Sequence, residues 1–143
     1  MRGADAPVID PALDRLWRHA ATSIPEWLPM RYVDWLPRAY AVTARFRAPR
    51  GASNLYLVLL DARDHHSESY GVYVGMSHHP PALRFDQHKS GIRAASSVLK
   101  RGLEVLTGPT LHLQRVNRAA AARIEAELAE ALRAEGLWVE GGH

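Results

Sequence analysis

The sequence predicts a mixed α/β domain, and three features of its 143 residues lead to this prediction. Residues 55–60 are apolar on both faces, which is typical of a central β-strand. Residues 70–75 form a second apolar run, so the two runs are expected to pair as an antiparallel hairpin with a long connection. Asn117 then precedes a long amphipathic helix that is expected to reach about Glu135, with Gly136 as its stop.

The composition narrows the class of protein. The chain has 47% hydrophobic and 23% charged residues, which is ordinary for a soluble globular protein. It contains no run of about 18 apolar residues, so no membrane span is expected. The first eleven residues contain no apolar core, so no secretory signal is expected either. The absence of cysteine excludes disulfides and thiolate chemistry and leaves a cytoplasmic location as the default.

Two elements are expected before the hairpin. Residues 10–20 begin with Asp and Pro and place apolar side chains at helical spacing, so they predict a short helix. Residues 38–48 alternate between larger apolar side chains and a partly basic side. This pattern predicts a strand with Arg45 and Arg47 on its outer face.

Three elements are expected between the hairpin and the long helix. A helix is expected over residues 81–89, with Gly91 as its stop. A shorter helix is expected next, ending at Gly102. After a Gly-Pro turn, residues 111–116 are expected to supply the third strand.

Glu125 is the most informative single position of the long helix. At about 100° per residue, Glu127 points to the opposite side of that helix. Burial of a carboxylate is costly unless a cation, a metal or strong hydrogen-bond donors accompany it. Glu125 is therefore a candidate functional residue, and a buried salt bridge is the alternative. Its neighbours on the same face are apolar: Ala121, Leu128, Ala129 and Leu132.

Arg84 and His88 are four residues apart, so they share one face of the helix over residues 81–89. A guanidinium can bind the oxygens of a phosphate, and an imidazole can exchange a proton near neutral pH. Both residue types are also common on solvated helix faces, so this pair alone is weak support for a phosphate site.

Tyr56 and Tyr73 lie within the two hairpin strands, where tyrosine usually serves packing. Gly71 and Gly75 flank Tyr73 on its own side of the strand. Missing side chains there are expected to leave open space around the phenol, which suits the approach of a ligand.

Positive charge is unevenly distributed along the chain. The formal net charge is +3, but residues 81–118 carry seven Lys or Arg and only two Asp or Glu. Such a block is either a solvated surface or a patch for a polyanion such as nucleic acid.

Taken together, these residues resemble the GIY-YIG nuclease family. The resemblance rests on Tyr56, on the sequence Tyr-Val-Gly at residues 73–75, and on Arg84, His88 and Glu125 in that order. The pairing of arginine and histidine is most similar to the restriction-endonuclease branch. Two departures from the family pattern are present. The first signature reads Asn-Leu-Tyr at residues 54–56 instead of Gly-Ile-Tyr, and no asparagine follows the glutamate helix.

The resemblance implies a fold and a division of the chain. It implies a small three-stranded antiparallel sheet flanked by helices. Residues 51–143 would form the nuclease domain, and residues 1–50 an accessory segment packed on it, with helical and strand structure.

The resemblance also implies the chemistry of the site. Glu125 would bind one divalent cation, Mg²⁺ or Mn²⁺, and Arg84 would bind the scissile phosphate. Tyr56 would orient or activate the attacking water, Tyr73 would hydrogen-bond in the same site, and His88 would assist proton transfer.

On this reading the chain is a metal-dependent DNA endonuclease. The alternatives are a nucleic-acid-binding module of the same fold that does not cleave, and a protein-interaction domain with a basic surface. Either a monomer or a homodimer is compatible with the sequence. The residues expected to follow the DNA backbone are Lys89, Arg93, Lys100 and Arg101, extended by Arg45 and Arg47.

Overall fold

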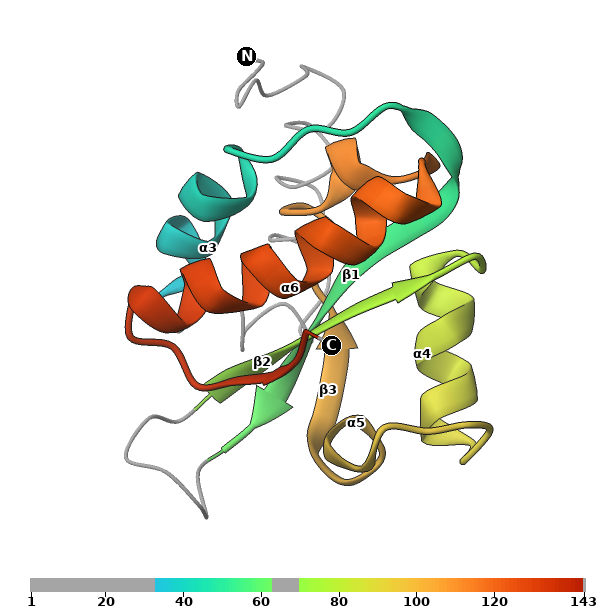
Figure 1. Cartoon of the computed structure of the whole chain (residues 1–143). Coiled ribbons are helices and arrows are strands. Elements are labelled where there is room, and N and C mark those ends of the chain that lie inside the picture. The colour runs from blue at the N-terminus through green and yellow to red at the C-terminus, as the bar shows by residue number, and fades with distance from the viewer. Residues whose placement is uncertain (1–32, 63–69, 143) are drawn as a thin grey trace, which may run out of the picture.

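A four-stranded sheet forms the centre of the protein (Figure 1). The computed structural model describes residues 33–62 and 70–142. The strands lie in the order β3-β1-β2-β4. Their bounds are Arg50–Asp61 for β1, Tyr70–Ser77 for β2, Gly102–Val105 for β3 and Val139–Gly141 for β4. The helices are α3 (Leu36–Thr43), α4 (Pro81–Lys89), α5 (Ser96–Arg101) and α6 (Arg118–Ala134), with a 3₁₀ turn, η2, at Leu111–Leu113.

The strand register determines which side chains share a face of the sheet. β1 pairs antiparallel with both β2 and β3, whereas β4 pairs parallel with β2. Tyr56 lies opposite Gly75, and Val58 lies opposite Tyr73. Directly opposed residues of neighbouring strands project to the same face, so Tyr56 and Tyr73 are on one side of the sheet.

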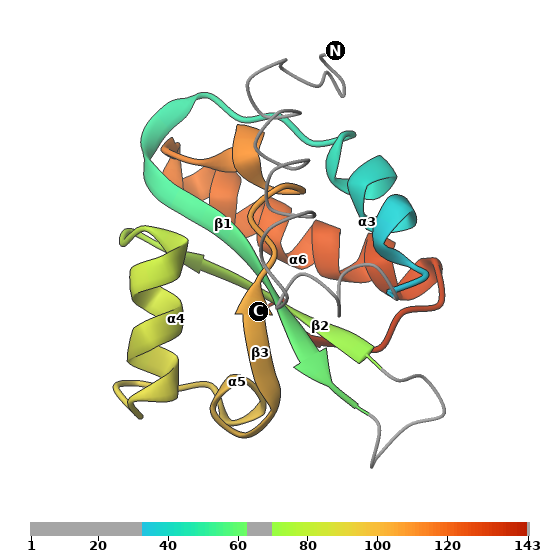
Figure 2. The ribbon, with the colours of Figure 1, turned by 180° about the vertical axis from the view of Figure 1, so that it is seen from behind.

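Helices cover both faces of the sheet (Figures 1 and 2). Leu55, Leu57 and Leu59 belong to the larger core, which they share with α3 and α6. The intervening residues Tyr56, Val58 and Leu60 belong to a smaller core with side chains of α4 and α5. β1 is therefore buried on both faces, which confirms the prediction of a central strand from its continuous apolar run.

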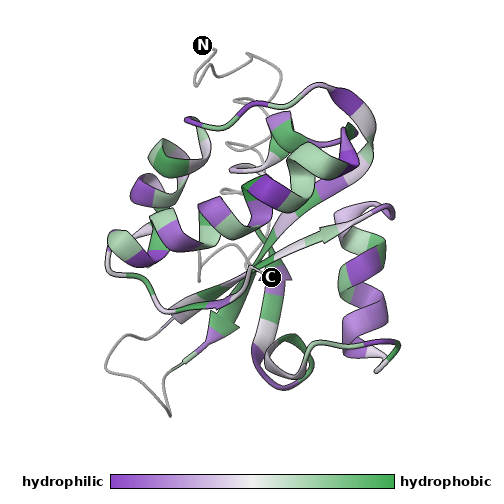
Figure 3. Cartoon of the chain, in the orientation of Figure 1, coloured by the Kyte–Doolittle hydropathy of each residue, from purple (hydrophilic) through white to green (hydrophobic). Residues whose placement is uncertain are grey.

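α6 confirms the predicted long helix and its ends. The Asn117 side chain accepts a hydrogen bond from the backbone N–H of Ala120 at 3.0 Å, as an N-cap does. Gly136 follows the helix with φ +92°, a left-handed conformation that favours glycine. Figure 3 shows the α6 ribbon alternating between hydrophilic and hydrophobic residues. The apolar side of α6 packs on β1 and β2.

α4 and α5 also lie where the sequence predicts helices. Gly91 ends the α4 region with φ +83°. Gly102 follows α5 with φ −65°, a conformation open to any residue, so backbone conformation is not the reason for glycine here. A Cβ at this position would lie 2.6 Å from the carbonyl oxygen of Val98, so the close approach of the two backbones requires glycine.

The predicted strand over residues 38–48 is wrong. Residues from Leu36 to Thr43 form α3, and Arg45 and Arg47 lie beyond its end. The buried side chains of α3 are Ala39, Val42 and Thr43, a helical spacing. The alternating pattern was compatible with both structures, and packing of this face into the core with α6 favours the helix.

The third strand of the sheet also differs from the prediction. It is β3, whereas residues 111–116 contain η2 and an irregular segment that makes only isolated bridges to the start of β1. β4 was not anticipated, so the sheet has four strands and mixed pairing rather than three antiparallel strands. β4 is too short to show a detectable alternation of apolar and polar residues in the sequence. Its extended structure depends on pairing with β2.

The described part of the first fifty residues belongs to the main core. Val33, Trp35, Ala39 and Val42 are buried with the leucines of β1. The predicted boundary at residues 50–51 falls at the first residues of β1. The helix predicted over residues 10–20 lies outside the described residues. Among the described residues, no helix has the length and apolar character needed to cross a membrane.

Candidate active site

A buried hydrogen-bond chain connects the loop after α4 to β1. The backbone N–H of Ala95 donates to Nδ1 of His88 at 3.0 Å, and Nε2 of His88 lies 2.8 Å from the Tyr56 hydroxyl. Since Nδ1 accepts a hydrogen bond, it bears no proton, and the neutral ring must carry its proton on Nε2. His88 therefore donates to the oxygen of Tyr56.

His88 is neutral at pH 7. Its exposed fraction is 1%, and both ring nitrogens are engaged. Burial lowers the pKa of His88 to about 4, and the positive charge of Arg84 lowers it in the same direction. Protonation would also place a hydrogen on Nδ1 against the Ala95 N–H. His88 is thus fixed as a donor to Tyr56.

Tyr56 and Tyr73 form the centre of the site. Their ring centroids are 6.1 Å apart, and the His88 ring centroid lies 5.7 Å from that of Tyr73. The chain of hydrogen bonds runs from the Ala95 amide through His88 to the Tyr56 hydroxyl, beside the Tyr73 ring.

Both phenols are protonated at neutral pH. Burial raises the pKa of Tyr56 well above its ordinary range, and Tyr73 raises it further. Burial also raises the pKa of Tyr73, followed by the negative charge of Glu125. Arg84 opposes the increase at both tyrosines, and Glu125 adds to it at Tyr56 as well. Arg84 and Glu125 are therefore within electrostatic range of both phenols.

The two glycines of β2 do not leave open space around Tyr73. A Cβ on Gly75 would lie 2.5 Å from the Tyr56 hydroxyl oxygen, so the phenol lies directly on that glycine. A Cβ on Gly71 would lie 2.9 Å from the carbonyl oxygen of Trp138. The expectation of an open approach is wrong, because a residue opposite each glycine fills the space. The glycines are required for packing of the site.

Arg84 holds the same loop as His88. Its guanidinium donates to the carbonyl oxygens of Ile92 at 3.1 Å and Arg93 at 2.8 Å, and to the Gln87 side chain at 3.3 Å. These bonds use three of its five N–H groups. Within the described part of the chain, Nε–H and one N–H of Nη2 make no other hydrogen bond. Arg84 and His88, on one face of α4, thus both bond to the loop before α5. Arg84 keeps two N–H groups that could bind a ligand.

Glu125 comes from α6, on the opposite side of the sheet from α4. It is 7% exposed, which confirms the burial predicted from the helical wheel. Glu127 is exposed and forms an ion pair with Arg123 at 3.9 Å. The end of β4 lies beside both residues: a Cβ on Gly141 would be 2.8 Å from the Tyr73 ring, and one on Gly142 would be 3.5 Å from the backbone oxygen of Glu125. The negative charge of Glu125 raises the pKa of both phenols.

The oxygen atoms of this site fit a hard divalent cation. Mg²⁺ is commonly bound by one or two carboxylates, with water and substrate phosphate completing its coordination. Glu125 supplies such a carboxylate, and the two phenols supply neutral oxygens nearby. Over residues 33–62 and 70–142, no group of three or more His, Cys, Asp or Glu side chains is placed to hold a metal. Glu125 is the acid of this site whose carboxylate could hold such a cation.

Two of the predicted DNA-binding residues have structural contacts instead. The Lys89 ammonium donates to the carbonyl oxygens of Leu99 and Gly102, both at 3.1 Å. The Arg101 guanidinium donates to the carbonyl oxygen of Asp61 at 3.1 Å. These bonds join α4 to α5 and α5 to β1. The sequence could not distinguish a structural cation from a surface one, because their partners are distant backbone carbonyls.

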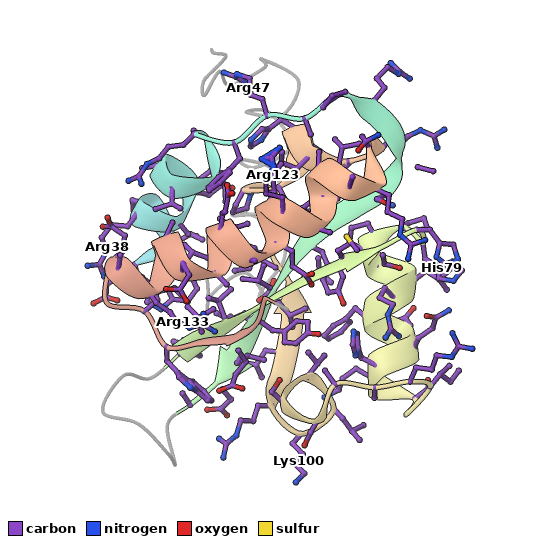
Figure 4. All side chains as sticks on the ribbon, viewed as in Figure 1. Arg38, Arg47, His79, Lys100, Arg123 and Arg133 are labelled. Carbon is purple, nitrogen blue, oxygen red and sulfur yellow. The ribbon has the colours of Figure 1, made fainter. Side chains whose placement is uncertain are left out.

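The remaining predicted DNA-binding residues do not form one footprint. Arg45 pairs with Glu135 at 3.9 Å. Arg93, Lys100 and Arg47 make no side-chain hydrogen bond or ion pair within the described part of the chain. Figure 4 shows Arg47 and Lys100 at opposite ends of the molecule. The strand that motivated the extension by Arg45 and Arg47 is absent, because residues 36–43 form α3; contact of these residues with DNA stays a prediction.

Asn54 is a site residue that the sequence analysis missed. Its amide donates to the carbonyl oxygen of His79 at 2.9 Å and accepts from the backbone N–H of Arg115 at 2.8 Å. It thereby joins the loop before α4 to the loop before α6, two residues from Tyr56. The available signal was that asparagine replaces the glycine of the family's first signature.

Comparisons with known proteins add no relative. No family model matches the chain, and neither the curated proteins nor the solved structures give a match. The described residues therefore define a mixed α/β protein with a buried tyrosine–histidine site, and its function is inferred from that site.

Proposed function

We propose that this protein is a divalent-metal-dependent endonuclease of the GIY-YIG type that hydrolyses phosphodiester bonds in DNA. The observation that carries the proposal is the contact of His88 with two phenols, Tyr56 and Tyr73, with Arg84 and Glu125 in electrostatic range of both phenols. These residues come from β1, β2, α4 and α6. They combine a cation, a carboxylate and hydroxyl groups, which are the groups that phosphoryl chemistry requires.

Arg84 would bind the scissile phosphate. Its Nε–H and its remaining Nη2 N–H can lie on one edge of the guanidinium, which matches two phosphate oxygens. The carbonyl oxygens of Ile92 and Arg93 hold the other N–H groups, so the guanidinium is oriented before the ligand arrives. Such preorganisation lowers the cost of ordering the side chain.

Tyr56 would orient the attacking water, with His88 as its positioning residue. A protonated phenol can fix a water or a phosphate oxygen through its hydroxyl group, and the Tyr73 phenol lies beside Tyr56. His88 is buried and bonded at both nitrogens. We therefore assign it to holding the Tyr56 hydroxyl rather than to exchanging protons with the substrate, which revises the role implied by the family resemblance.

Glu125 would hold Mg²⁺ or Mn²⁺. When bound, the cation supplies Lewis-acid stabilisation of the charge on the phosphate and leaving oxygen. The burial of Glu125 reduces competition from bulk water for its carboxylate. The position of this carboxylate near Tyr73 supports a common site for the metal and the phenols.

One observation favours a nucleic-acid-binding module that does not cleave. The Arg84 guanidinium already bonds to two backbone carbonyls and a side chain, so a structural role for it is complete without a phosphate. A cleavage assay separates this alternative from the nuclease.

The proposed activity is tested by nicking of supercoiled plasmid with Mg²⁺, with Mn²⁺ and with EDTA. Glu125→Gln removes the negative charge with little change in shape, and we expect it to lower metal-dependent cleavage by more than about 100-fold. Glu127→Gln is the matched control, because Glu127 is an exposed acid on the same helix. It should cleave like the parent.

Two outcomes would contradict the proposal. Equal cleavage by the parent and Glu125→Gln would remove Glu125 from the chemistry. A parent that binds plasmid but does not nick it with either metal would instead support the module without cleavage.

A further inference from the structure

Two segments of the chain contain arginine but no acidic residue. Residues 35–60 hold four arginines and no Asp or Glu, and residues 105–124 hold three arginines and no Asp or Glu. These segments meet at the start of β1, where Arg50 and Val116 form an isolated bridge. The fold therefore concentrates positive charge at a place that neither segment indicates by itself.

The backbone at this meeting point is tightly held. The Gly51 N–H donates to the carbonyl oxygen of Arg115 at 2.9 Å, and the Asn117 N–H donates to that of Pro49 at 2.7 Å. The Asn54 side chain accepts from the Arg115 N–H. Arg115 also has φ +56°, which is uncommon for a residue with a side chain. A rigid, locally strained backbone thus presents an exposed arginine, a combination found at ligand-binding sites.

Three arginines at this point have no side-chain partner among the described residues. Arg50, Arg115 and Arg118 are exposed. Over the described ranges, their side chains make no hydrogen bond or ion pair. By contrast, Arg133 pairs with Glu130 at 3.0 Å, and Arg38 donates to the carbonyl oxygen of Glu135 at 3.3 Å. The arginines at the end of α6 are therefore engaged, whereas those at its start are available.

The available arginines are connected to the candidate active site through α6 and β1. Arg118 and Glu125 are seven residues apart on α6, so they share one side of the helix at a separation of about 10 Å. Arg115 is joined through Asn54 to the strand that carries Tyr56. The arginines are thus within about two turns of α6 and a few residues of β1 from the site, a distance that a short stretch of nucleic acid spans.

We propose that Arg50, Arg115 and Arg118 form a phosphate-binding cluster that holds the backbone of nucleic acid beside the active site. The inference rests on the proposed function for its choice of ligand. Arginine suits this ligand because its planar guanidinium binds phosphate oxygens in pairs. The cluster differs from the footprint predicted at Lys89 and Arg101 in that the charged groups of those two residues bond to backbone carbonyls.

The test is the salt dependence of binding of a short duplex DNA in EDTA, where metal-dependent cleavage does not occur. Arg115→Gln with Arg118→Gln is compared with Arg38→Gln with Arg133→Gln. Both double variants remove two positive charges, the first near the start of α6 and the second near its end, where Arg38 of α3 donates to Glu135. Circular dichroism and thermal unfolding establish that each variant is folded. Since Arg115 and Arg118 use only backbone groups in the fold, the first variant should fold like the parent.

We expect the first variant to reduce the slope of log affinity against log salt by about 2, and the second to leave the slope unchanged. Equal slopes for the parent and the first variant would overturn the cluster, as would equal reductions in both variants or a parent that does not bind DNA at low salt. The result for the cluster can be distinguished from the result for the proposed nuclease activity. A reduced slope with no plasmid nicking supports the cluster and rejects the nuclease, whereas nicking with an unchanged slope does the reverse.

Discussion

Acidification should destabilise this protein through His88. In the folded chain the pKa of His88 is lowered to about 4, whereas an unfolded histidine titrates near 6.5. Above about pH 6.5 the ring is neutral in both states, so its contribution to stability is complete. As the pH falls from about 6.5 toward 4, the unfolded chain binds a proton that the folded chain does not. The free energy of unfolding must therefore decrease in this window.

The expected size follows from the two pKa values. Between pH 7 and about pH 4.5, the linkage relation gives a loss of about 2 kcal/mol for His88 after a reduction for solvent screening. Other groups also titrate in this range, so the quantity to measure is a difference between two proteins. His88→Gln removes the titrating group and keeps an N–H that can donate to Tyr56. Urea unfolding at both pH values should show the parent losing about 2 kcal/mol more than the variant.

NMR of the ring nitrogens checks the same reasoning directly. At pH 7, Nε2 of His88 should carry the proton and Nδ1 should show the shift of an unprotonated acceptor. The ring should titrate near pH 4 and not near 6.5. A ring that titrates near 6.5, or that carries its proton on Nδ1, would refute the assigned direction of the His88–Tyr56 hydrogen bond. An equal loss of stability in the parent and His88→Gln would refute the linkage argument.

Two further substitutions test the packing of the site. Gly75→Ala would place a methyl group against the Tyr56 phenol. We expect the free energy of unfolding in urea to fall by about 2 kcal/mol and plasmid nicking to be lost. Parental values for both would show that the phenol has room to move. Lys89→Gln should lower stability by about 1 kcal/mol, because its hydrogen bonds to two carbonyl oxygens are lost. The control Lys100→Gln should stay within about 0.5 kcal/mol of the parent. Equal effects would mean that the Lys89 bonds contribute nothing to stability.

Local patterns were sufficient to predict several elements. The continuous apolar run of β1 indicated burial on both faces, and Asn117 and Gly136 indicated the ends of α6 through capping geometry. These signals depend on short-range interactions. A capping side chain accepts a hydrogen bond from a nearby backbone N–H, and a glycine adopts the backbone conformation that ends a helix. The burial of Glu125 followed from the same periodicity, because one helix turn determines which residues share a face.

The secondary-structure predictions that were wrong concern elements that depend on long-range contacts. The alternation over residues 38–48 predicted a strand, whereas packing with α6 favours the helix α3. β3 and β4 are short strands whose existence depends on pairing with β1 and β2. No local pattern specifies such partners, since the pairing residues are separated in the chain by dozens of positions.

The same division applies to the candidate site. The sequence by itself determined the residue types and their order: Tyr56, Tyr73, Arg84, His88 and Glu125. Only the tertiary structure decided how they interact, with His88 as a donor to Tyr56 and Arg84 bound to the loop after α4. It also decided which cations are available, because a lysine or arginine that bonds to a distant carbonyl has the same sequence signature as one that faces solvent. The physical reason is that hydrogen-bond direction and charge pairing are properties of positions in space, which the fold brings together and the order of residues does not express.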